Sequence, residues 1–165
     1  EMREGMLLND PVLRHFSPID LSVPTFAVLY ASIITALIFL LRNPRQLIIA
    51  VQSYTLLIIF RIIAMYLMPL ESPANQIPLA DPFVEFFVDG ATLTQDLFFS
   101  GHTSVMCILF FTAEHKWLKR IFFVGILTIV TFVTLQHAHY VVDVFIAPFV
   151  AFTSYWIVTN ARRKE

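Results

Sequence analysis

The distribution of apolar and polar residues divides the chain into five long apolar runs separated by short polar segments. The runs occupy residues 23–41, 46–70, 97–113, 117–136 and 140–159. Four of them are close to the length that crosses the roughly 30 Å hydrocarbon core of a bilayer as a helix, whereas the third is short. β-branched and aromatic residues are abundant, but the runs lack the alternation of barrel strands. Because lipid offers backbone amides no partner, the pattern predicts five transmembrane helices.

The composition supports a protein that is embedded in lipid. Hydrophobic residues make up 58% and charged residues 14% of the 165 residues, and the mean hydropathy is +0.74. No composition break or repeat divides the chain, so we expect an interfacial lead-in over residues 1–22 and one transmembrane domain over residues 23–165. The net charge of −1 gives no basic surface for nucleic acid. The lone Cys107 cannot close an intramolecular disulfide.

The basic residues between the runs predict how the helices are oriented. They follow the first run, separate the third from the fourth and follow the fifth: Arg42, Arg45, Lys116, Lys119, Arg120, Arg162, Arg163 and Lys164. In a five-helix zigzag these sites share one side, which the positive-inside rule makes cytoplasmic. The connection from Glu71 to Asp96, with acidic residues and no Lys or Arg, then lies on the opposite side. This layout places the N-terminus outside, so we expect a further helix before it.

Three unusual side chains reach the same depth near the non-cytoplasmic side of this zigzag. Arg61 lies in the outward half of the second run, and His102 and His139 lie at the outward starts of the third and fifth. Asp143 follows His139 by four residues, so on a helix the carboxylate and the imidazole share a face. Such an oriented imidazole can attack phosphorus, while a second histidine protonates the departing oxygen. We therefore predict His102, His139 and Asp143 as catalytic residues.

A phosphate group would also need donors and positive charge around its oxygens. Arg61 is a suitable cation. Ser100, Gly101 and Thr103 surround His102 at the start of the third helix, where they provide free amides, hydroxyls and room for close approach. We predict Arg61, Ser100, Gly101 and Thr103 as the phosphate-binding residues.

Two motifs resemble the C-terminal signatures of the sphingomyelin synthase family, which belongs to the lipid phosphate phosphatase superfamily (type 2 phosphatidic acid phosphatases). They are Asp96-Leu-Phe-Phe-Ser-Gly-His102-Thr103 and His139-Tyr-Val-Val-Asp143-Val. Arg61 with the following Pro69 and Pro73 is similar to an earlier motif of that family. The resemblance covers roughly residues 45–150.

The resemblance implies an all-α membrane bundle whose His102 acts as acid and then as base. His139 would become the phosphohistidine, Asp143 would orient it, and Asp96 would have a supporting role. Such enzymes move a phospho-headgroup between lipids, or release it to water, without metal or other cofactor. The family typically has six helices, which fits a missing first one. The arginine that usually precedes the final histidine is absent, since Val133 and Thr134 lie there, so phosphate binding would depend more on Arg61.

Three alternatives to a lipid phosphotransferase stay open. A phosphatase would use the same residues with water as the acceptor. An intramembrane metallohydrolase would use His102, His137 or His139 and Asp143 as ligands, but no two histidines have the one-turn helical spacing of zinc proteases. A non-catalytic membrane protein would retain the motifs for packing.

Overall fold

The computed structural model describes residues 6–68, 70–73, 75–81 and 98–163, and these ranges contain helices and no β-strand. The helices are α1 (Ser22–Leu40), α2 (Pro44–Leu67), α4 (Gly101–Thr112), α5 (Lys116–Leu135) and α6 (Val141–Arg162), with a short 3-10 helix at Leu13–His15. This arrangement confirms the expected all-α fold. Each helix lies within one of the five apolar runs or within a few residues of it.

Four of the helices, α1, α2, α5 and α6, are long and apolar enough to cross a membrane. Only 22% to 33% of the residues in their most apolar segments are buried within the protein. Large apolar side chains such as Phe145 and Phe149, which are 67% and 60% exposed, therefore point away from the bundle. Lipid is the solvent that such an outward face requires.

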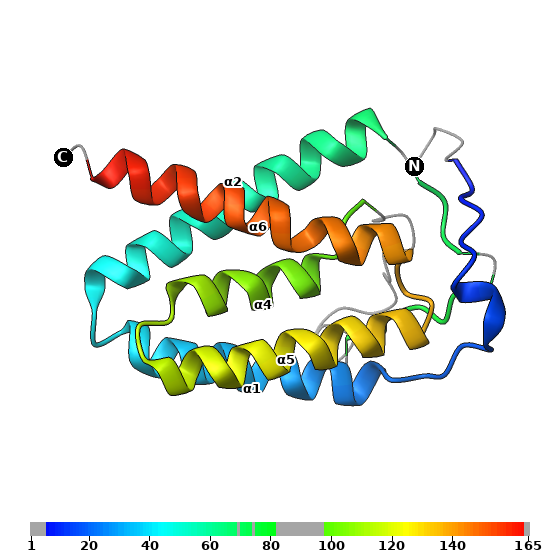
Figure 1. The fold of residues 1–165 in the computed structure, drawn as a ribbon, viewed down its shortest axis with the longest axis horizontal. Coiled ribbons are helices and arrows are strands. Elements are labelled where there is room, and N and C mark those ends of the chain that lie inside the picture. Colours follow the sequence, from blue (N-terminus) through cyan, green and yellow to red (C-terminus); the bar gives the residue numbers. More distant parts are fainter. Residues whose placement is uncertain (1–5, 69, 74, 82–97, 164–165) are drawn as a thin grey trace.

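The third expected span differs from the prediction because α4 has only 12 residues. Residue 97 lies outside the described residues, and residues 98–100 precede the helix. At 1.5 Å per residue α4 is about 18 Å long, well short of the hydrocarbon core. Figure 1 shows α4 between α6 and α5. The start of α4 lies nearer the middle of the bundle than the start of α6. No residue of α4 is classed as exposed, so it forms the centre of the bundle.

A glycine of α5 lies where that helix packs against α4. A Cβ atom placed on Gly125 of α5 would collide with the terminal methyl group of Met106 on α4. Met106 is completely buried, as are Ile129 and Val133 on the same side of α5. The missing side chain at Gly125 therefore leaves room for the end of the Met106 side chain between the two helices.

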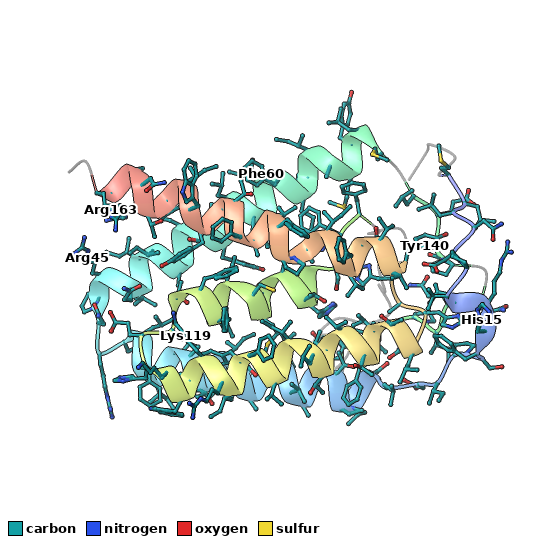
Figure 2. The ribbon with its side chains drawn as sticks, in the orientation of Figure 1. His15, Arg45, Phe60, Lys119, Tyr140 and Arg163 are labelled. Atoms are coloured by element: carbon teal, nitrogen blue, oxygen red, sulfur yellow. The ribbon has the colours of Figure 1, made fainter. Side chains whose placement is uncertain are left out.

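The two ends of the bundle carry different side chains. Figure 2 shows Arg45, Lys119 and Arg163 together at one end, which we call the cation-rich end. Tyr140 and His15 lie at the other, which we call the Tyr140 end.

Candidate functional site

Arg61, on α2, lies against the start of α4. Its Nη1 donates a hydrogen bond to the carbonyl oxygen of Phe99 at 3.0 Å, and its guanidinium carbon lies 5.8 Å from the centre of the Phe99 ring. A Cβ atom on Gly101 would collide with the same Nη1 atom. Glycine at this position is what allows the guanidinium to lie over the first turn of α4. The structure thus brings together two residues that were predicted to bind phosphate.

Ser100 is the N-cap of α4. Its Oγ accepts a hydrogen bond from the Thr103 amide at 3.4 Å and another from the Thr103 hydroxyl at 3.1 Å. Both side chains are completely buried. The two hydroxyls, which we expected to contact phosphate, pair with each other and fix the start of the helix.

Phe99, which the sequence did not single out, has a left-handed backbone with φ of 41°. This conformation is unusual for a bulky residue and costs on the order of 1–3 kcal/mol. Phe99 is 1% exposed, and its carbonyl is the one that accepts the hydrogen bond from Arg61. The strained turn therefore lies directly beside the candidate phosphate site.

His102 lies in the first turn of α4 on the side that faces α1. Its ring packs edge-on against Phe26 at 5.4 Å, and Phe26 stacks on Tyr30 at 5.9 Å. The Tyr30 hydroxyl in turn donates to the carboxylate of Asp81, at 2.6 and 2.8 Å from its two oxygens. The described contacts of His102 do not join it to His139. Asp96, the expected supporting residue, lies outside the described residues.

His139 and Asp143 lie close together but are not on one helix. His139 occupies the turn before α6, whereas Asp143 is the third residue of that helix. His139 Nδ1 lies 3.8 Å from Asp143 Oδ2, which is ion-pair distance and longer than a hydrogen bond. The side chains are 6% and 1% exposed. Asp143 Oδ2 also accepts the Tyr140 amide at 3.3 Å, so the carboxylate caps α6 as it faces the imidazole.

A backbone hydrogen bond joins the starts of α4 and α6. The amide of Ser100 donates to the carbonyl oxygen of Asp143 at 3.2 Å. The same α4 start lies under Arg61, so one end of α4 connects the cation on α2 with the His139–Asp143 pair. Helix N-termini carry partial positive charge, which favours anions near α4 and α6.

His137 also lies in the turn between α5 and α6, but it faces elsewhere. It is left-handed with φ of 56°, and its ring packs edge-on against Phe16 at 5.0 Å. It lines a cavity of about 300 Å³ on the side of the N-terminal segment. Burial lowers the pKa of His137, and nearby Asp10 opposes that shift. The ring is therefore neutral near pH 7.

Gln136, which sequence reasoning missed, is a buried hydrogen-bonding centre beside this turn. Its Nε2 lies 2.8 Å from the Ser22 hydroxyl and 3.3 and 3.2 Å from the carbonyls of Ile77 and Pro78. Its Oε1 accepts the Leu21 amide at 3.1 Å. One side chain therefore ties the end of α5 to the start of α1 and to the segment that follows α2. The one sequence feature that pointed to this role is that Gln136 is a polar residue at the end of the apolar run of residues 117–136.

Metal ligation finds no support in the described parts of the chain. Within them, no group of three or more His, Cys, Asp or Glu side chains could hold a metal ion. The His139–Asp143 pair has no third ligand there.

Residues 95–160 match the family model described as PAP2 superfamily C-terminal. The match contains His102, His139 and Asp143, whereas Arg61 lies outside it. It supports membership of the PAP2 superfamily, whose members are phosphatases and phosphotransferases, and so supports an enzyme of this broad kind. No curated protein and no solved structure matches the chain.

Proposed function

We propose that the chain is a lipid headgroup phosphotransferase, similar to sphingomyelin synthases, that works through a phosphohistidine at His139. The observation that carries the proposal is the convergence of Arg61, the α4 start at Gly101 and the His139–Asp143 pair. A cation, a helix N-terminus and an oriented imidazole are the groups that phosphoryl transfer requires.

In the first step, Nε2 of His139 attacks the phosphorus atom of a phospholipid. The Nδ1 side of the ring faces Asp143, so the carboxylate stabilises the positive charge that develops on the imidazole. The bond between phosphorus and the lipid oxygen breaks, and that oxygen takes a proton from His102. The products are a lipid alcohol and a phospho-headgroup bound to His139.

In the second step, His102 takes the proton of an acceptor hydroxyl, whose oxygen attacks the phosphorus. The bond between phosphorus and His139 breaks, and the imidazole is regenerated. A lipid alcohol as acceptor gives a new phospholipid, whereas water gives the free phospho-headgroup. Which acceptor reacts depends on how well the closed site excludes water.

Arg61 would hold the equatorial phosphate oxygens during both steps. A guanidinium presents five N–H donors in a planar fork, and the hydrogen bond to Phe99 uses one of them. Gly101 adds no side chain between Arg61 and the first amides of α4. Ser100 and Thr103 support this arrangement by capping the helix.

We also propose that the site takes lipid from the non-cytoplasmic leaflet, because the cations gather at the opposite end of the bundle (Figure 2). A Cys at Asn75 should react in intact cells with a thiol reagent that does not cross membranes, whereas a Cys at Glu114 should react only after lysis. Cys107 is 2% exposed and gives little background. The reverse labelling pattern would contradict this orientation.

The activity is tested with purified protein in vesicles that contain headgroup-labelled phospholipid, with and without ceramide or diacylglycerol. A transferase moves the label to a second, newly formed phospholipid, and does so only when the acceptor lipid is present. Release of soluble labelled headgroup alone would instead identify the phosphatase. His115→Ala, at the cation-rich end, is the control that should leave turnover intact. Absence of every product in wild-type protein would favour the non-catalytic alternative.

A further inference from the structure

The N-terminal segment of residues 6–16, which we call the N-terminal strap, lies at the Tyr140 end (Figure 2). At its beginning, Met6 pairs with Leu70 after α2. At its end, Phe16 packs against His137 in the turn that precedes α6. The strap therefore contacts the polypeptide that carries the proposed nucleophile.

The carboxylate of Asp10 connects the strap to α6. Its Oδ2 accepts a hydrogen bond from the amide of Val141 at 2.8 Å. Its Oδ1 accepts the amides of Val12 and Leu13, at 2.9 and 3.4 Å, and so closes the turn within the strap. One carboxylate thus satisfies free amides of two helix starts at once.

We propose that Asp10 is a positioning residue for His139. Val141 is the first residue of α6 and lies midway in sequence between His139 and Asp143. His139 is outside the helix, so the 3.8 Å separation of Nδ1 from Asp143 Oδ2 depends on how the turn meets α6. By holding the Val141 amide, Asp10 fixes that junction. The inference rests on the proposed function, in which His139 is the nucleophile.

Packing and hydrogen bonds both hold the strap against this turn, and Leu13 of the strap forms a buried apolar cluster with Tyr140 and Leu70. A cavity of about 300 Å³ lies between the strap and the turn, lined by Asp10, Leu13, His137 and Tyr140 among others. Hydrogen bonds span the gap, from Val141 to Asp10 and from the Leu8 amide to the Tyr140 hydroxyl at 3.3 Å. Of these two hydrogen bonds, only the one to Asp10 involves a charged group, which makes it the stronger kind.

Asp20 provides a matched control because it plays the same local part at another helix. Its Oδ1 accepts the amide of Ser22, the first residue of α1, at 3.0 Å. The start of α1 carries none of the proposed site residues. Loss of Asp20 should therefore weaken one helix start without moving His139.

The test compares Asp10→Ala, Asp10→Asn and Asp20→Ala in vesicles, with turnover expressed per folded molecule. Misplacing a reacting group by about 1 Å lowers rates by about 100-fold, so Asp10→Ala should lower kcat by about 10- to 100-fold with little change in KM. Asp10→Asn keeps one acceptor oxygen for two sets of amides and should give an intermediate kcat. Asp20→Ala should retain the wild-type kcat. An unchanged kcat in folded Asp10→Ala, or an equal loss in Asp20→Ala, would overturn the proposal.

A second measurement judges the positioning role even if wild-type protein shows no turnover. Nitrogen NMR of histidine-labelled protein, with the His139 signal assigned from a His139→Gln variant, reports the tautomer and surroundings of the ring. Asp10→Ala and Asp10→Asn should shift that signal, and Asp20→Ala should not. Absent turnover with a shifted signal would reject the proposed function while keeping the positioning role. An unshifted signal in both Asp10 variants would reject the positioning role.

Discussion

The two ends of the helix bundle both carry polar side chains, but they use them differently. At the cation-rich end, Asn43 bonds both carboxylate oxygens of Glu114 at 3.1 Å, and Arg162 bonds Gln52 at 2.7 Å, and all of these contacts are exposed. At the Tyr140 end, the polar residues around the turn before α6 are buried: Gln136, His137, His139, Tyr140 and Asp143 are, as whole residues, each at most 5% exposed.

The buried polar groups of the Tyr140 end are the ones placed at an energetic cost. Exposed polar contacts exchange readily with water and contribute little. A buried polar group destabilises the protein unless a partner meets it, and a buried carboxylate beside a histidine is a frequent mark of a functional site. Substitutions should therefore have large effects at the Tyr140 end and small ones at the cation-rich end.

The largest contrast is expected between two histidines. His139→Ala should remove the phosphoenzyme and lower turnover by about 10⁴-fold or more, the scale seen when a nucleophile is lost. His115→Ala, which is exposed at the other end, should leave both unchanged. Acid-labile phosphate is measured by mass spectrometry of peptides. Phosphate found on His102 in place of His139 would reverse the proposed roles.

The next effect concerns Arg61. Arg61→Ala should reduce catalytic efficiency by about 2–4 kcal/mol of transition-state stabilisation, as for other donors to developing negative charge. Arg61→Lys keeps the charge but loses the planar fork and should fall between Ala and wild type. The measurement is kcat/KM per folded molecule in detergent. A folded Arg61→Ala protein with an unimpaired rate would remove Arg61 from the site.

Gln136 should affect stability more than catalysis. Gln136→Leu leaves buried groups of α1 and of the segment after α2 without their partner, which costs about 1–3 kcal/mol in the free energy of unfolding. Gln76→Leu is the matched control, because its side chain makes one described hydrogen bond, to the Ala138 carbonyl at 3.4 Å. Thermal unfolding in detergent compares the two. Equal losses would show that Gln136 is not the stronger tie.

The smallest effect is expected at the cation-rich end. Glu114→Ala removes an exposed partner of Asn43 and should change the free energy of unfolding by less than about 0.5 kcal/mol. The same unfolding measurement applies. A loss as large as that of Gln136→Leu would show that exposed polar contacts at the cation-rich end contribute as much stability as buried ones at the Tyr140 end.

The apolar runs were enough to predict the helices because in lipid a long apolar run has few other options. Their limits were less predictable, since caps decide them: Asn43 with Pro44 begins α2 before the run expected from residue 46. The third run was expected to be short, but α4, with 12 residues, is shorter than the run of residues 97–113. Its start depends on the left-handed turn at Phe99, and no pattern of apolar residues encodes such a turn.

Spacing along the chain predicted part of the candidate site. Asp143 lies close to His139, as their four-residue separation suggested, although the turn before α6 replaces the expected helix. Partners far apart in sequence were beyond such reasoning. Asp10 meets Val141 across 131 residues, and Leu21 meets Gln136 across 115, so only the folded bundle brings them together.

The shortness of α4 also bears on how the protein responds to membranes of different thickness. The four long helices, of 19 to 24 residues, form the surface that must match the hydrocarbon layer. They can tilt when the layer is thinner or thicker, at a cost of fractions of a kcal/mol per Å. Because no residue of α4 is classed as exposed, its depth is set by packing against its neighbours. The helix start that carries His102 therefore keeps its place within the protein while the surrounding bilayer changes thickness.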